Sequence, residues 1–255
     1  MVGKRYPFYS VASVVAMIVL WQLASTYLID PFFLPAPTAV VKGTGELLRE
    51  GILLKSIGAS LGRIFAGWIL GSLVAIPVGL LVGSSPVVRS LVDPFTHFFR
   101  FIPALALITL FIVWFGVGEL SKILLIVYST GFIVMINTAT GVAAIPEEKI
   151  CAARCLGANR RQLFLHVTAP ATVPYIYVGM RLAMASSFLV IVAAEMLAAN
   201  SGLGYLIWTS RLYFRIDWMF AGIVLLGLLG YGTDRLWRLV GSTLLARYLR
   251  EVSRY

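Results

Sequence analysis

Four ionisable residues lie within, or at the ends of, long apolar segments of this 255-residue chain: Arg63, Arg100, Arg181 and Glu195. A charge at the centre of a membrane helix costs on the order of 3 kcal/mol or more unless it is paired or hydrated, so such residues are candidates for function. The arginines could hold a positive potential for a small anion. The alternative is structural, with side chains that reach the span ends or pair with Glu195, and we prefer it for each residue taken alone.

The sequence contains few residues in patterns typical of catalytic, nucleotide-binding or metal-binding sites. The two histidines, His97 and His166, do not form a His-Glu-x-x-His pattern, and the chain has neither a Gly-x-Ser-x-Gly elbow nor a Gly-x-x-x-x-Gly-Lys-Ser/Thr phosphate loop. Cys151 and Cys155 are one helical turn apart, with no nearby His or Cys to complete a metal site, and we interpret them as small packing residues. The sequence therefore predicts no enzyme, no cofactor and no metal in this chain.

The composition is that of a membrane protein. Hydrophobic residues make up 60% of the chain and charged residues 13%, and the mean hydropathy is +0.91. About 20 apolar residues are needed to cross a bilayer, so the chain has room for five or six spans and no separate soluble domain. We predict an all-α membrane protein with a single transmembrane domain over residues 1–255, whose core covers about 55–245. The net charge of +10 is interpreted as setting orientation, so we expect no nucleic acid as a partner.

About six transmembrane helices are expected from the apolar segments. Their predicted bounds are 11–29, 56–83, 95–115 with a kink at Pro103, 123–144, 171–199 and 218–239. Short helices at the membrane surface are expected within 38–49 and 200–216, and brief loops at 84–94 and 116–122.

The second predicted span carries small residues at a strict interval of four: Gly67, Gly71, Ala75, Gly79 and Gly83. Such a ladder lets the backbone of another helix approach closely. We predict a packing seam, either within the chain or between two copies.

A polar, basic interruption at 146–170 separates the fourth and fifth spans. Pro146 and Glu147 suit the start of a short helix, and Gly157 is placed to end it in a left-handed conformation. Small side chains at Ala152 and Ala153 would let a soluble partner close down on the backbone, with basic residues nearby for an acidic rim. On spacing alone, an ordinary loop with orienting arginines explains the segment at least as well.

The distribution of basic residues predicts which side of the membrane this interruption occupies. With six spans, one side of the membrane holds both termini, the 84–94 loop and the interruption. Twelve of the 21 Lys and Arg lie on that side, six lie on the other side, and three lie within spans. The excess places the interruption and both termini in the cytoplasm.

The interruption resembles the cytoplasmic loop of ABC importer permeases, whose pattern is Glu-Ala-Ala, three residues, Gly, nine residues, Ile, one residue, Leu-Pro. The matching residues are Ala152-Ala153, Gly157, Val167 and Ala169-Pro170. Cys151 stands in the place of the Glu, so a carboxylate is missing from this loop. Further segments, from about Leu34 to about Leu245, are similar to the nitrate, sulfonate, taurine and bicarbonate permeases: 34–37, 102–107, 114–123, 193–197 and 201–206.

The resemblance implies one permease subunit of a type I importer in a prokaryotic plasma (inner) membrane. Two copies, or this chain with a relative, would form the pore; two cytoplasmic ATPase subunits would bind ATP and Mg²⁺; and an external binding protein would deliver the solute. The fourth and fifth spans would be joined by a coupling helix. The residues expected to contact the ATPase are Glu148, Cys151, Ala152, Ala153, Arg154, Gly157, Ala158, Arg160 and Pro170.

Pore walls in such importers are often apolar and small, which adds weaker pore candidates: Met135, Asn137, Ser186 and Ser187. The alternative function is a gradient-driven secondary transporter. Inverted repeats and carboxylates deep in the bilayer would be expected of it, and only Glu195 approaches that description.

Overall fold

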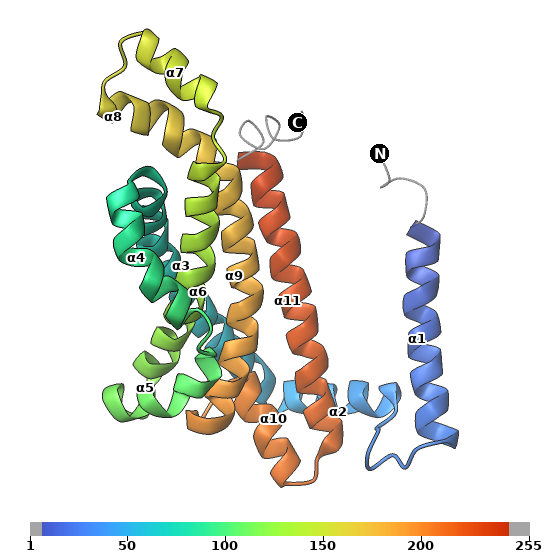
Figure 1. The fold of residues 1–255 in the computed structure, drawn as a ribbon. Helices are drawn as coiled ribbons and strands as arrows, with labels where there is room; N and C mark the ends of the chain where they lie inside the picture. The colour runs from blue at the N-terminus through green and yellow to red at the C-terminus, as the bar shows by residue number, and fades with distance from the viewer. Residues whose placement is uncertain (1–6, 245–255) are drawn as a thin grey trace.

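The computed structural model describes residues 7–244, which form helices and no strand (Figure 1). The helices are α1 (Pro7–Tyr27), α2 (Pro37–Arg49), α3 (Ile52–Ser84), α4 (Pro86–Phe99), α5 (Ile108–Phe115), α6 (Glu119–Ala143), α7 (Glu147–Cys155), α8 (Arg160–Leu163), α9 (Ala169–Ala198), α10 (Leu203–Leu212) and α11 (Ile216–Leu244). A 3₁₀ turn at Ala104–Leu107 precedes α5, and a π-helical segment at Phe164–Thr168 joins α8 to α9. The terminal basic residues used to predict orientation lie outside the described residues: Lys4, Arg5, Arg247, Arg250 and Arg254.

The core is built by α3, α6 and α9, which pack side by side, with α11 beside α9. Figure 1 shows α7 and α8 beyond one end of this bundle, called here the α7 end, and α2, α5 and α10 at the opposite end, called here the α2 end. Both ends of the described chain lie toward the α7 end. Helix α1 stands apart from the bundle and touches the rest chiefly through α2 and the segment before it, so its apolar side chains are largely exposed.

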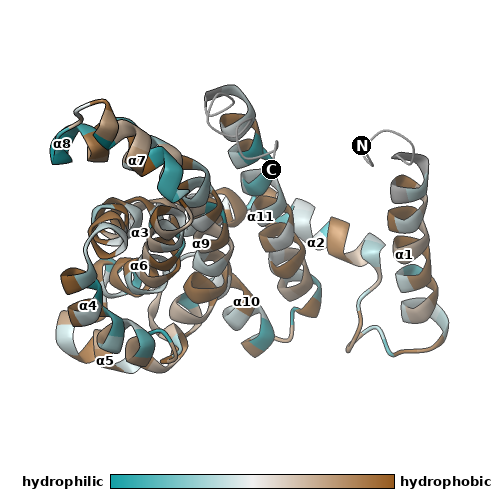
Figure 2. Cartoon of the chain, turned by 45° about the horizontal axis from the view of Figure 1, so that its top comes forward, coloured by the Kyte–Doolittle hydropathy of each residue, from teal (hydrophilic) through white to brown (hydrophobic). Residues whose placement is uncertain are grey.

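Four helices among the described residues are long and apolar enough to cross a membrane: Ile52–Ser84, Glu119–Ala143, Arg160–Ala198 and Ile216–Thr243. A bent pair of helices can supply a fifth crossing, and the apolar stretch Val11–Tyr27 of α1 is shorter than these. The all-α membrane fold predicted from composition is confirmed. Figure 2 shows that hydrophobic residues dominate the bundle, whereas α8 and the first turn of α7 are hydrophilic.

The prediction that the third span is a single kinked helix is wrong. Instead of one helix over 95–115 with a kink, the chain forms α4 and the 104–115 helices, which meet at an angle of 82°. Helix α4 begins at Pro86, within the expected 84–94 loop, where Ser85 accepts a hydrogen bond from the Val88 N–H and caps the helix. The break falls at 100–103 because Pro103 cannot donate a helical hydrogen bond.

Two other boundaries also differ from the prediction. Helix α6 begins at Glu119 rather than at 123, which places Lys122 in its first turn and buries it to 4% exposure. Pro170 lies in the first turn of α9 rather than in the polar loop, directly after the π-helical segment. The helical stretch that includes the fifth crossing therefore starts at Arg160.

The small-residue ladder is a seam within the chain. A Cβ added at Gly67 would lie 2.5 Å from the Ile126 Cβ of α6, and one added at Gly83 would lie 2.5 Å from the Val142 Cβ. Gly71 and Gly79 face the same helix, against Thr130 and Thr138. The interval of four keeps these positions on one face of α3, so the backbones of α3 and α6 approach closely along several turns.

Replacing Gly67 with Ala should destabilise the protein by about 1–3 kcal/mol, because the added methyl group overlaps Ile126 and forces the helices apart. Gly62→Ala is the matched control, since nothing lies within 4 Å of a Cβ there and Ala favours a helix by about 1 kcal/mol over Gly. Thermal unfolding of the purified protein in detergent measures both. Equal melting temperatures for the two variants would contradict the seam.

Candidate functional site

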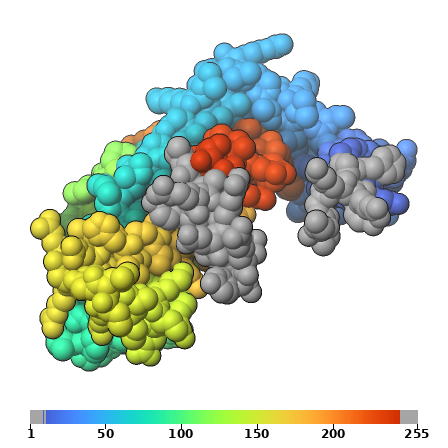
Figure 3. Space-filling model, turned by 90° about the horizontal axis from the view of Figure 1, so that it is seen from above, coloured from blue at the N-terminus to red at the C-terminus, as the bar shows by residue number. Residues whose placement is uncertain are grey.

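Helix α7 projects from the α7 end and has no buried residue. Glu147 and Glu148 lie in its first turn, where the helix dipole favours negative charge, and Gly157 follows its end with a φ of +82°. The next side chain beyond the helix, Leu156, is 88% exposed. Figure 3 shows α7 and α8 uncovered on the face seen from above. An apolar side chain presented on a sharply ended helix is suited to enter a groove in a partner.

Local hydrogen bonds hold this segment in one shape. The Ala158 N–H donates to the Ala153 carbonyl over 3.0 Å, and the Gly157 N–H donates to the Arg154 carbonyl over 2.9 Å. Asn159 then caps α8 reciprocally with Gln162, with distances of 2.8 and 2.9 Å. The sequence contains this Asn-x-x-Gln capping signature, but the prediction of a coupling segment did not use it.

The residues expected to contact an ATPase lie mostly on this surface. Those exposed are Glu148, Cys151, Ala152, Arg154, Gly157 and Arg160, and those partly buried are Ala153, Ala158 and Pro170. The interpretation of Cys151 and Cys155 as packing residues is wrong, because both thiols are free and exposed. No group of three metal-ligating side chains occurs in residues 7–244.

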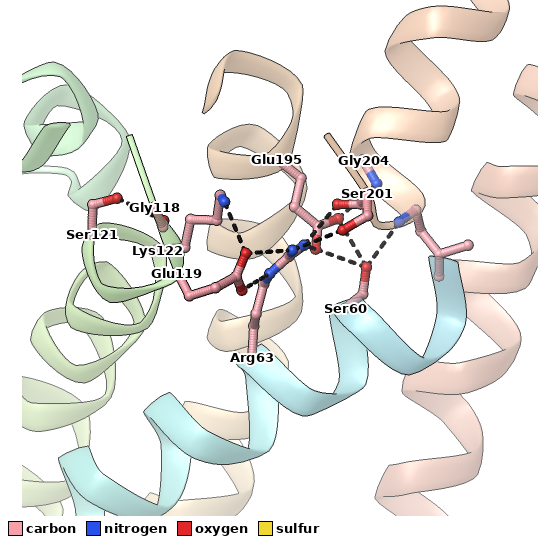
Figure 4. Close-up of polar contacts among 10 residues, drawn as sticks. Ser60, Arg63, Gly118, Glu119, Ser121, Lys122, Glu195, Ser201 and Gly204 are labelled. Carbon is pink, nitrogen blue, oxygen red and sulfur yellow. Dashed lines mark hydrogen bonds and ion pairs between the residues drawn. The ribbon is translucent and has the colours of Figure 1, made fainter. Parts of the chain in front are cut away.

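At the α2 end, Arg63 of α3 lies between two carboxylates (Figure 4). Its Nη1 donates to Glu195 Oε1 over 2.7 Å, and its Nε and Nη2 donate to the two oxygens of Glu119 over 2.5 and 2.8 Å. Nη1 and Nη2 also donate to the carbonyl and hydroxyl of Ser201, over 2.7 and 3.0 Å. Arg63 is 5% exposed and Glu195 is fully buried. One guanidinium therefore joins α3, α6, α9 and the turn after α9.

The Glu195 carboxylate also receives hydrogen bonds from neutral groups. Ser60 Oγ donates to it over 2.8–2.9 Å and accepts from the Leu203 N–H over 2.8 Å, while the Gly204 N–H donates to Glu195 Oε2 over 2.9 Å. The turn folds so closely over the carboxylate that a Cβ at Gly202 would overlap it. Gly202 also has a φ of +119°, which side chains rarely adopt. The Ser-Gly-Leu-Gly segment is thus shaped around a buried charge.

This network bears on two of the four ionisable candidates. Arg63 and Glu195 form an ion pair with each other. This is the pairing that the structural alternative predicted for the arginines. Their contribution to a pore stays a prediction. Glu119 was missed because its segment was assigned to a loop, although a Glu just after Gly116-Val117-Gly118 suits a helix N-terminus.

Arg181 pairs with α11 rather than with Glu195. Its Nε donates to Asp234 Oδ1 over 2.5 Å and its Nη2 to Asp234 Oδ2 over 3.1 Å, and Arg238 contacts the same carboxylate. This ion pair lies at a largely apolar cavity of about 550 Å³ between α9 and α11. Asp234 was not among the predicted partners.

Arg100 lies at the break between α4 and the 3₁₀ turn. Its side chain is exposed, stands 4.8 Å from the Phe101 ring, and is in no ion pair with any described residue. It lines a cavity of about 350 Å³ together with Ser129 of α6 and Ser186 of α9, whose hydroxyl oxygens are 2.6 Å apart. Irregular backbone at membrane depth is tolerated where it lines a cavity. The structure thus brings two predicted pore residues together, Arg100 and Ser186.

Of the four weaker pore candidates, the three besides Ser186 do not line this cavity. Ser187 is fully buried and donates to the Ala183 carbonyl over 2.8 Å, and Met135 is 8% exposed within the core. Asn137 donates to the Ile133 carbonyl of its own helix over 2.8 Å. Ser129 and Tyr128 line the cavity but were not predicted, because hydroxyls within an apolar run give no distinct pattern.

Replacing Arg63 with Met should cost about 3–5 kcal/mol, because Glu195 and Glu119 would lose the charge that compensates them. Arg49→Met on the exposed end of α2 is the control, with an expected change within about 0.5 kcal/mol. Thermal unfolding in detergent compares the two. A melting temperature for Arg63→Met equal to that of the control would show that the network does not hold the helices together.

Comparisons with known proteins agree with this architecture. Residues 75–244 match the family model for the binding-protein-dependent transport system inner membrane component. A probable ABC transporter permease protein of Brucella melitensis is 42% identical over 203 residues, covering 80% of this chain and 82% of the relative. The taurine transport system permease protein of Escherichia coli K12 is 34% identical over 222 residues, with coverages of 85% and 81%.

A solved structure shares the fold. An inward-facing structure of the MetNI methionine ABC transporter aligns with a TM-score of 0.66 and 19% identity, covering 78% of this chain and 97% of the other. At that identity the likeness concerns the fold alone. The family match and the relatives together identify the chain as a member of the family of inner-membrane components of binding-protein-dependent ABC transport systems, which are transport permeases rather than enzymes.

Proposed function

We propose that the chain is the permease subunit of an ATP-driven importer, and that with a second copy it forms the pathway for a small anion such as a sulfonate, taurine, nitrate or bicarbonate. The family membership and the taurine permease relative support this assignment. The observation that carries it is α7, a rigid, exposed helix set between α6 and α9. These two helices contribute the serine pair of the Arg100 cavity.

Two features indicate the partners: the sequence has no phosphate loop for ATP, and helix α7 is exposed. Two ATPase subunits bind ATP and Mg²⁺ and each takes one α7 into a surface groove, while an external binding protein delivers the solute. The α7 end and both termini face the cytoplasm of a prokaryote, in line with the excess of basic residues on that side. The basic residues after α7 pair with an acidic rim on the ATPase.

Motion at α7 is transmitted directly to the helices of the cavity. Residues 144–146 join α7 to α6, and α8 with the π-helical segment joins it to α9. At the α2 end, the Arg63 network ties α6, α9 and α3 together. A pull on α7 therefore tilts α6 and α9 about a fixed end and changes access to the cavity.

The solute passes the Arg100 cavity. The Arg100 guanidinium has no competing carboxylate in contact among the described residues. One hydroxyl of the Ser129–Ser186 pair donates to the other, so the pair has one O–H left to donate to an anionic oxygen. A volume of about 350 Å³ has room for a compact anion with part of its hydration shell.

Leu156→Asp should reduce the affinity of the permease for its ATPase by about 2 kcal/mol or more, because a charge replaces the apolar side chain expected to enter the partner groove. Leu156→Met, which keeps the apolar contact, is the control. Co-purification from detergent and ATP-driven uptake by proteoliposomes give the readouts. Uptake by the lone chain driven by an ion gradient would instead favour the secondary transporter.

Arg100→Gln should lower ATP-driven anion uptake at least about tenfold, since removing one charge-assisted contact costs about 1.5–3 kcal/mol. ATPase binding should be unchanged because Arg100 lines a cavity to which neither α7 nor α8 contributes a residue. Arg100→Lys should recover part of the uptake, and Arg211→Gln, at an exposed position near the end of α10, is the control. Unchanged uptake with normal assembly would remove Arg100 from the pathway.

A further inference from the structure

The break at 100–103 leaves a backbone carbonyl at the end of α4 without its usual helical donor. In a continuous helix the N–H of residue 103 would donate to the Phe99 carbonyl, but Pro103 has no N–H. The Ile102 N–H donates to this carbonyl over 3.0 Å instead, which leaves one lone pair of the oxygen unused. Within residues 7–244, α4 packs chiefly against α3, and Thr96 is its one buried residue. The packing of α4 alone therefore does little to fix the break.

Tyr128 of α6 supplies a second donor. Its hydroxyl donates to the Phe99 carbonyl over 2.7 Å, and the same oxygen lies 3.4 Å from the Ile102 carbonyl oxygen. Among residues 7–244, no other side chain donates to either carbonyl. The Tyr128 ring is itself held, because it stands edge-on to the rings of Phe111 and Phe132 at centroid distances of 6.4 and 5.1 Å. A hydroxyl held on α6 thus fixes the point at which α4 ends.

The same turn of α6 faces the cavity of the proposed pathway. Tyr128, Ser129 and Ile102 line this cavity together with Arg100. Because the one O–H of Tyr128 is donated to Phe99, the phenol has no hydrogen left to donate to an anion in the cavity. The hydroxyl is therefore placed to hold the backbone beside Arg100 rather than to bind an anionic solute.

We propose that Tyr128 is a positioning residue, whose hydroxyl holds the break against α6 and so places Arg100 at the cavity. This role rests on the proposed function, in which Arg100 lies on the solute pathway. Arg100 is in no ion pair with a described residue, so its place is set chiefly by the backbone that Tyr128 holds. Because α6 also leads into α7, the break moves with α6 when the ATPase pulls on α7.

Tyr128→Phe tests this role in the assembled transporter, because it removes the hydroxyl and keeps the ring. A nitroxide label is attached at Phe98→Cys, an exposed position in the last turn of α4, and every sample in nanodiscs also carries Cys151→Ser and Cys155→Ser. Tyr128→Phe should raise the mobile fraction of the label about two- to tenfold, the change in population expected for one lost hydrogen bond. Tyr177→Phe is the matched control, since its hydroxyl also donates to a backbone carbonyl, on α11, over 3.3 Å.

Uptake measurements connect the break to transport. ATP-driven uptake of radiolabelled taurine, or of nitrate if the unaltered chain takes up no taurine, is measured in proteoliposomes that contain the ATPase and the binding protein. Tyr128→Phe should lower the uptake per ATP hydrolysed about two- to tenfold. Beside Arg100→Gln, the same substitution should have little further effect, because residues that act through one another are not additive. A general loss of structure would lower uptake alike in both backgrounds.

Three results would each overturn the proposal. They are a label as immobile in Tyr128→Phe as in Tyr177→Phe, a rise in mobility without a loss of uptake, and an equal loss of uptake beside Arg100→Gln. The proposed function is judged separately, because Arg100→Gln alone tests whether Arg100 lies on the pathway. The mobility of the label depends on no solute, so it reports on the Tyr128 hydrogen bond whatever the uptake shows.

Discussion

The buried ion pair of Arg63 with Glu195 is the constraint on which the arrangement of the helices depends. Two charges removed from water favour the folded state only when their remaining hydrogen-bonding groups are also satisfied. Here Glu119, Ser60, Ser201 and the backbone N–H of Gly204 satisfy them. Because these groups come from α3, α6, the turn after α9 and α10, the pair can be satisfied only when all of these segments are in place.

The two ends of the bundle differ in how they are held. At the α2 end, charges and hydrogen bonds connect the helices. At the α7 end, the projecting helix α7 packs chiefly against α8 and the π-helical segment within residues 7–244. Between the two ends the glycine face of α3 lies directly against side chains of α6, among them those of Ile126 and Val142. A close-packed seam resists separation but has few polar contacts to break, so it can carry force from one end to the other.

Much of the fold followed from hydropathy, small-residue spacing and turn chemistry. The apolar segments located the long helices, Gly157 located the end of α7, and the ladder on α3 located the seam. The break at 100–103 was expected only as a kink at Pro103, because a proline indicates where a helix is interrupted but not the angle at which the chain continues. That angle depends on what the two pieces pack against.

The sequence by itself determined that this chain crosses a membrane, where most of its long helices begin and end within a few residues, and which loop is available to a partner, because these depend on local composition and backbone conformation. Only the tertiary structure decided that Arg63 pairs with Glu195 and Arg181 with Asp234, while Arg100 is left at a cavity with Ser186. Residues 53 or more positions apart leave no local pattern that specifies their pairing. Long-range charge partners are set by how the helices pack.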